Sequence, residues 1–139
     1  MELSFAFLAN AADTSRGGRL TVMGADFDTL WVDRIPCIHA CSMVAKFLIQ
    51  MEERDQPNTA ALRFRTPSGA VSEIIDGLPM KAIPHPLRPD RPTSACMLLA
   101  LTFPIPEVGD YEFEILADGQ LVKTIQLLVV LGPAPGEFE

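Results

Sequence analysis

The sequence YEFEILADGQLVKTIQLLVVL, residues 111–131, decides the fold class. Tyr111 and Phe113 alternate with glutamates, which is the period of a half-buried strand. Asp118-Gly119 then interrupts the pattern, and Asp-Gly between two such runs is typical of a tight β-hairpin turn. The segment therefore predicts an antiparallel hairpin whose second strand covers Leu121–Leu131.

Short apolar runs that end in turn signals recur in the middle of the chain. Ala60–Phe64 alternates with two outward-pointing arginines, and Thr66-Pro67-Ser68-Gly69 has the chemistry of a β-turn. Ala70–Ile75 is the expected returning strand. This spacing of strands and turns is typical of a two-layered all-β domain.

The N-terminal part repeats the pattern. Leu3–Phe7 alternates as a first strand, and the paired glycines of Ser15–Gly18 predict a hairpin turn. A second extended run is expected over Arg19–Val32, with Gly24 as a bulge inside it and Pro36 after its end.

Two segments leave alternatives open. Val44, Phe47, Leu48 and Met51 have helical spacing, whereas the odd-numbered residues of 43–51 share one face of a strand. The strand is preferred, because no capping residue stands where the helix would begin. Residues Ala95–Phe103 have no polar face, which predicts either a central strand buried on both sides or a strand whose outer face meets another subunit.

Leu78–Pro92 carries five prolines in fifteen residues. Proline lacks a backbone donor and fixes φ, so this stretch cannot be a helix interior or a central strand. We expect a stiff crossover between sheets, and such long connections are often functional.

Length and composition limit the class of protein. A chain of 139 residues with 48% apolar residues suits one domain, residues 1–139, with a core of its own. The predicted fold is all-β, a single antiparallel β-sandwich of about eight strands, Ig-like or C2-like. The net charge of −7 argues against nucleic acid or an anionic membrane as partner. Three cysteines and the absence of a basic leader predict a reduced, cytoplasmic setting without a cofactor.

Cys37, His39 and Cys41 are the strongest metal candidates. They share one face of a strand, but the two cysteines would lie about 13 Å apart along it, too far for one zinc ion. Nothing in the sequence brings Cys96 close enough to complete a site. We therefore reject a metal site here and expect two buried thiols beside a hydrogen-bonded histidine.

A ligand site is the second possibility. Asp26 and Asp28 are expected to project from one face near Trp31, the single tryptophan, whose ring could stack on a sugar. His85 stands between two prolines in an exposed, rigid position. These four residues are the candidates for binding a small molecule or a carbohydrate.

Apolar residues at outward positions suggest that a sheet face is covered by another subunit. The strongest interface candidates are Leu98 and Ala100 in one strand and Leu128 and Val130 in another. Further apolar residues predicted to point outward are Val44, Leu48 and Leu116.

The order of several weak motifs resembles a family of small uncharacterised bacterial proteins, a domain of unknown function. The motifs are the apolar first strand with its glycine hairpin, Gly24–Asp28, the pair Pro36 and His39, and the final Gly-Asp-Tyr…Asp-Gly hairpin. The resemblance covers most of the chain and implies an all-β sandwich, with no activity. Cys37 and Cys41 depart from the family pattern around His39.

No recognised catalytic motif is present, and two histidines leave few routes to acid–base chemistry. The leading hypothesis is a non-catalytic interaction or assembly module that acts as a homo-oligomer. A small-molecule or carbohydrate binding module is the alternative. A thiol- or zinc-dependent activity through Cys37, His39 and Cys41 is the weaker one.

Overall fold

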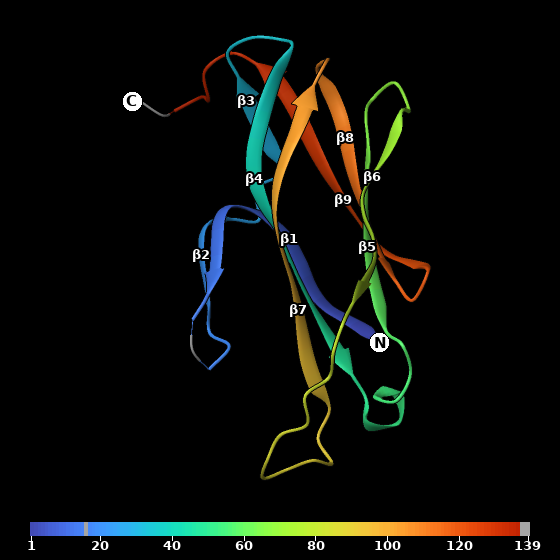
Figure 1. Cartoon of the computed structure of the whole chain (residues 1–139). Helices are drawn as coiled ribbons and strands as arrows, with labels where there is room; N and C mark the ends of the chain where they lie inside the picture. Colours follow the sequence, from blue (N-terminus) through green and yellow to red (C-terminus); the bar gives the residue numbers. More distant parts are fainter. Residues whose placement is uncertain (16, 137–139) are drawn as a thin grey trace.

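The computed structural model describes residues 1–15 and 17–136 and is built almost entirely from β-strands (Figure 1). No helix in this part of the chain is long and apolar enough to cross a membrane. The strands are β1 (Glu2–Thr14), β2 (Leu20–Ala25), β3 (Thr29–Val32), β4 (Cys37–Ile49), β5 (Thr59–Arg65), β6 (Val71–Pro79), β7 (Thr93–Ile105), β8 (Gly109–Ala117) and β9 (Gln120–Leu131), with a short 3₁₀ helix, η1 (Met51–Glu53), before β5.

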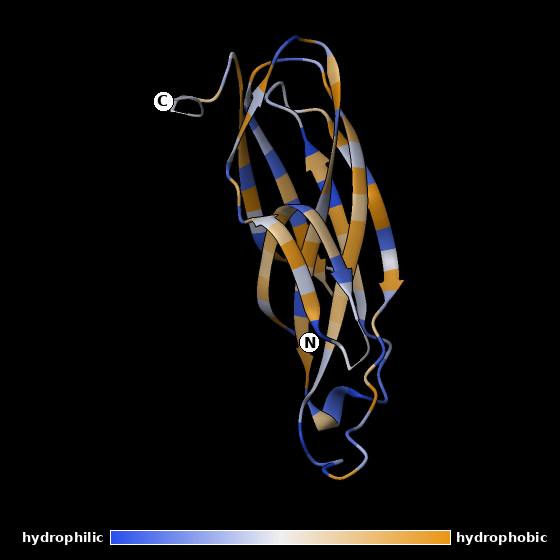
Figure 2. Ribbon diagram, turned by 90° about the vertical axis from the view of Figure 1, so that its left-hand side faces the viewer, coloured by the Kyte–Doolittle hydropathy of each residue, from blue (hydrophilic) through white to orange (hydrophobic). Residues whose placement is uncertain are grey.

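The strands form two sheets that are not closed into a barrel. The first sheet has the order β2-β1-β4-β7, and the second has the order β3-β9-β8-β5-β6. Hydrophobic and hydrophilic residues alternate along several strands (Figure 2). The inward residues of both sheets, among them Phe47, Leu62 and Phe113, join in one buried core.

The structure confirms the β5–β6 and β8–β9 hairpins that the turn sequences predict. Asp118 and Gly119 both have positive φ, 50° and 81°, as the turn between β8 and β9 requires. The Thr66 carbonyl accepts a hydrogen bond from the Gly69 amide, which closes the turn between β5 and β6. The β1–β2 hairpin is also present, although Arg16 in its turn lies outside the described residues.

The run Arg19–Val32 is not one strand. It divides into β2 and β3, which belong to different sheets, because the chain bends at Asp26, where φ is 59°. Strand β3 then pairs with β9 in parallel, so the expectation of a purely antiparallel arrangement is wrong at this edge. The division also explains why the described residues hold nine strands instead of about eight.

Strand β1 presents a different face to the core than simple alternation predicts. The β1–β4 register shifts between Leu3 and Phe5, and this irregularity turns Ala6 and Leu8 inward. Phe5 and Phe7 therefore stack on the outer face, with their ring centroids 5.7 Å apart. The Lys123 ammonium, reaching over from β9, donates a hydrogen bond of 3.2 Å to the Ala6 carbonyl.

The two ambiguous segments are both strands. Residues 43–49 belong to β4, and Met43, Ala45 and Phe47 are fully buried on one face, which confirms the strand interpretation. Strand β7 lies at the edge of the first sheet, so of the two alternatives for this segment the central strand is wrong.

The proline-rich crossover joins the two sheets, as expected, and runs from residue 80 to residue 92. It begins two residues later than predicted, because Leu78 and Pro79 still pair with β5. Strand β6 is an edge strand, where the missing proline donor costs no ladder hydrogen bond.

The outer face of the second sheet is charged. Glu114 is nearly buried there, although it lies on the outer side of β8. Arg65 on the neighbouring strand donates to its carboxylate at 3.2 Å, and the Arg63 Nε atom lies 3.8 Å from the same oxygen. The two arginines thus point outward, as the sequence predicts.

Candidate functional site

The β1–β2 hairpin folds back over the outer face of the first sheet. The first part of β1, Glu2–Ala9, pairs with β4, and its last part pairs with β2. Figure 1 shows β1 leaving the N-terminus, bending near the middle of the molecule and returning along the left side, and Figure 2 views the hairpin from that side. The hairpin tip consequently lies next to residues of β4 and β7.

Gly24 and Asn10 explain part of this bend. Gly24 has a φ of +63°, and a β-carbon at this position would lie only 2.3 Å from the Asn10 Nδ2 atom. Only glycine meets both conditions without strain or displacement of Asn10. The close approach of the two strands therefore depends on the glycine that the sequence singled out as a bulge.

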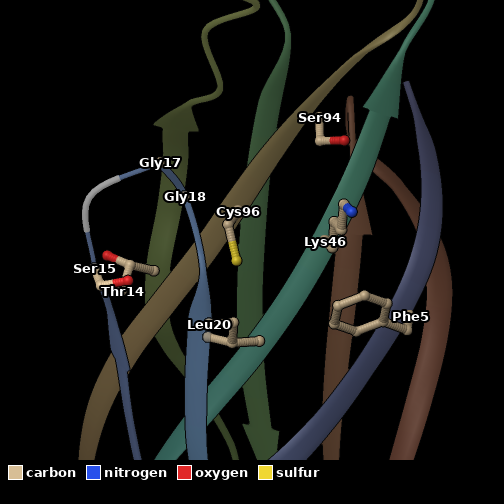
Figure 3. Close-up of a pocket in the computed structure, with 9 residues that line it drawn as sticks. All are labelled: Phe5, Thr14, Ser15, Gly17, Gly18, Leu20, Lys46, Ser94 and Cys96. Atoms are coloured by element: carbon tan, nitrogen blue, oxygen red, sulfur yellow. The ribbon is translucent and has the colours of Figure 1, made fainter.

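A hollow of about 620 Å³ lies between the hairpin tip and the sheet (Figure 3). The hairpin supplies one wall, and side chains from β1, β4 and β7 supply the other. The residues that line it are Phe5, Thr14, Ser15, Gly17, Gly18, Leu20, Lys46, Ser94 and Cys96.

Val44 shows how tightly the hairpin covers the sheet next to this hollow. Its neighbours Met43 and Ala45 point into the core, so Val44 points to the outer side of β4. Val44 is nevertheless fully buried, and it is not part of the main core cluster. Its partners in the neighbouring strands are Phe7 of β1 and Leu98 of β7, which are both half-buried.

Among the described residues that line the hollow, Lys46 is the one with a charged side chain. It is half-buried, and no carboxylate of the described residues lies within 4.0 Å of its ammonium. Its Nζ atom lies 5.9 Å from the centre of the Phe5 ring, a cation–π distance. The hollow is therefore positively charged, on a chain whose net charge is −7.

Cys96 lies opposite Lys46 in the β4–β7 ladder. Burial raises the pKa of its thiol, and the Lys46 charge opposes this rise without cancelling it. The thiol is thus protonated at neutral pH and is a weak nucleophile. With a cation, an aromatic ring and the hydroxyls of Thr14 and Ser94, the hollow has groups that can bind a small molecule.

Comparison with known protein families places this architecture in context. Residues 4–130 match a family of unknown function, DUF6941. The chain belongs to this family. No curated protein matches it. The span matched to DUF6941 contains every residue that lines the hollow and the whole of β7.

In this DUF6941 member, the four predicted ligand residues do not form one site. Asp26 and Asp28 are exposed in the link between β2 and β3, outside any strand, so the face they were expected to share does not exist. Trp31 in β3 is 40% exposed and lies beside Val130 of β9. His85 lies in the crossover, at the opposite end of the molecule from β3 (Figure 1).

The local contacts of these residues are structural. The Asp28 carbonyl accepts a hydrogen bond from the Leu128 amide, which fixes the start of β3 against β9. The His85 Nδ1 atom accepts hydrogen bonds of 3.1 Å from the amides of Leu87 and Arg88, which holds the ring within its own turn.

Cys37, His39 and Cys41 share the inward face of β4, as predicted. His39 packs between the rings of Phe27 and Phe103, at centroid distances of 6.5 and 5.7 Å. Its Nε2 atom is buried without a hydrogen-bond partner, so the prediction that His39 is hydrogen-bonded is wrong for this atom. Burial lowers the pKa of His39 and raises that of Cys41 to about 11. No three histidine, cysteine or acidic residues of the described chain lie close enough to hold a metal ion.

The four interface candidates lie on opposite sides of the molecule. Leu98 and Ala100 are on the outer face of the first sheet, where Leu98 is half-buried and Ala100 is exposed. Leu128 and Val130 are on the outer face of the second sheet, where Leu128 is 39% exposed. They cannot form one continuous patch.

Sequence reasoning missed Phe5, Lys46 and Cys96 as a group. They come from three strands, and only the bend in β1 brings the hairpin over them. The available signal was a lysine at an outward position within the apolar stretch 43–51.

Proposed function

We propose that this chain is a non-catalytic interaction module that associates with a second copy of itself through the free edge of β7. The supporting observation is the edge itself. Strand β7 is thirteen residues long, and among the described residues it pairs only with β4. Its other side presents unpaired amide and carbonyl groups, which can add a strand from another chain.

The remaining sheet edges carry more protection than β7, whose one proline, Pro104, lies next to its last residue. Strands β2 and β3 are short, with six and four residues. Strand β6 contains Glu73, Asp76 and Pro79, and its register with β5 is irregular. Charges, proline, irregular pairing and short length are the usual guards of an edge. From Thr93 to Ile105 there is no charged residue, so β7 is a long edge without a charge to guard it.

A second copy is the partner that best fits this edge. Two chains of net charge −7 repel each other, and an uncharged strand is where they can approach most closely. Two β7 strands that run antiparallel across a two-fold axis would join two four-stranded sheets into one of eight strands. Leu98 and Ala100 would then lie beside the axis on the outer face.

We also infer that the two sheets form a β-sandwich of the Ig-like type. In support, the N-terminal region contributes β1 to one sheet, antiparallel to β4, and β3 to the other, parallel to β9. The Tyr111 hydroxyl near the start of β8 donates a hydrogen bond of 2.6 Å to the Glu107 carbonyl, as in the tyrosine corner of Ig-like domains.

Light scattering coupled to size-exclusion chromatography tests the association. At micromolar concentration, we expect twice the 15.2 kDa mass of one chain. The double variant Ala100→Lys/Thr102→Lys puts like charges across the proposed axis, so we expect it to elute as a monomer. Gln126→Lys adds a charge at an exposed position of the second sheet and should leave the dimer intact.

A wild-type chain that stays monomeric would overturn the proposal. So would a double-lysine variant that dimerises as well as the wild type. Urea unfolding shows whether that variant is folded. Hydrogen exchange of the wild type provides a second readout, because only the β7 amides should gain protection as the protein concentration rises.

A further inference from the structure

The geometry points to a binding site for a small organic carboxylate with an apolar body, in the hollow under the β1–β2 hairpin. This inference goes beyond self-association and does not rest on it. At about 620 Å³, the hollow has the size of small-molecule sites in proteins. Its residues come from β1, the hairpin tip, β4 and β7, so it is a built feature of the fold.

The charge of the ligand follows from Lys46. Its ammonium faces a hollow, and the described residues that line this hollow include no acidic one; no carboxylate of the described chain lies within 4.0 Å of the ammonium. A half-buried cation without a counterion gains from a bound anion more than an exposed lysine does, because water screens it less. The Lys46 ammonium is one compact positive charge, so the ligand that it fits carries one negative charge.

A carboxylate fits this donor set better than a phosphate group does. Phosphate sites commonly combine an arginine fork, several basic groups or a helix N-terminus. None of these is among the described residues that line the hollow, which offer one lysine together with the hydroxyls of Thr14 and Ser94. A monoanion with few acceptor atoms can be satisfied by these groups.

The apolar body of the ligand follows from Phe5 and Leu20. Phe5 is 37% exposed, and its ring forms part of the sheet-side wall. Leu20 belongs to the hairpin, and Figure 3 shows its side chain between the hairpin strand and β4. An aliphatic chain or a ring placed between the two walls would cover both side chains and leave the carboxylate at Lys46.

Octanoate and phenylacetate are the probes, with octanamide as the uncharged counterpart of octanoate and inorganic phosphate as the competing anion. Isothermal titration measures their affinities for the wild-type chain. We expect saturable binding of at least one carboxylate, and about ten-fold weaker binding or none for octanamide and phosphate. The Cys96 thiol provides an independent readout, because a bound carboxylate should slow its alkylation by iodoacetamide.

The decisive variant is Lys46→Met, which keeps the length of the side chain and removes its charge. We expect it to bind the carboxylate about ten-fold more weakly. Lys81→Met removes the same charge from an exposed position in the crossover and should bind like the wild type. Because both variants change the net charge equally, their difference isolates the site.

Three results would overturn the inference. The first is that neither carboxylate binds the wild type saturably or slows alkylation of Cys96. The second is equal loss of binding in Lys46→Met and Lys81→Met. The third is phosphate binding more tightly than either carboxylate, which would assign the hollow to another ligand. None of these results depends on whether the chain is a monomer or a dimer.

Discussion

Replacing Val44 by alanine tests whether the hairpin covers the sheet. Val44 is fully buried on the outer side of β4, so the substitution removes two buried carbon atoms. At about 0.8 kcal/mol for each, the lost burial is about 1.6 kcal/mol, and the cavity left behind raises the total to about 2 kcal/mol. This cost requires that the outer face is covered at Val44, both by its strand partners Phe7 and Leu98 and by the β1–β2 hairpin that lies over this face.

Ile38→Ala is the matched control, because Ile38 lies on the same strand and the same face. Its side chain is 74% exposed, beyond the reach of the hairpin, so the three carbons removed contribute only about 0.6 kcal/mol. Both substitutions replace a β-branched residue by alanine, and the loss of strand propensity is therefore similar. The two variants should differ by about 1.4 kcal/mol in the free energy of unfolding.

Urea unfolding measures this difference through the transition midpoint at an unchanged slope. If Val44→Ala costs no more than Ile38→Ala, the hairpin does not cover the sheet in solution. The hollow between them would then lose one of its walls.

Three further predictions concern other parts of the fold. The wild type should lose stability between pH 9 and about pH 11, because the buried Cys41 thiol stays protonated after the unfolded thiol has ionised. In pH-dependent urea unfolding, Cys41→Ala should abolish this loss of stability, whereas Cys96→Ser should keep most of it. Glu114→Gln should cost about 1–2 kcal/mol in a urea titration, because Arg65 then keeps only Glu112 as an ionic partner and Arg63 loses its pairing with Glu114. Gly24→Ala should lower the thermal midpoint, because the new β-carbon meets the Asn10 side chain and because the positive φ is strained. Adding Asn10→Ala should recover only the part caused by the contact with Asn10, since the strain of the positive φ, about 1 kcal/mol, remains.

The parts of the fold that the sequence predicts well are those governed by local rules. The hairpin around Asp118 could be predicted because a tight turn needs positive φ, which Asp and Gly accept, and because Tyr111 and Phe113 alternate with glutamates ahead of the turn. The strand over 43–49 could be predicted for the same reason, since one set of alternate residues is uniformly apolar.

The predictions failed where one residue changes the direction or the face of a strand. The irregularity after Leu3 exchanges the two faces of β1, and the residue types at Phe5 and Phe7 do not indicate this shift. The bend at Asp26 sends the chain into the other sheet, which separates the carboxylates expected to share a face. The hollow depends on the bend in β1 together with long-range packing, so sequence periodicity could not locate it.

The hydrogen bond from Lys123 to the Ala6 carbonyl has a consequence for the other border of the first sheet. Between Glu2 and Phe7, β1 pairs with no described strand other than β4, because β2 pairs with the later part of β1 and the Asp26 amide bonds to the Leu8 carbonyl. A foreign chain that sought to extend the sheet there would have to displace a lysine side chain tethered in β9. The two edges of the sheet therefore differ in whether another chain can add a strand. The β1 edge is blocked by the Lys123 side chain, and the β7 edge is open. If assembly proceeds by strand addition, it should therefore stop at two copies, because each chain offers a single unblocked border.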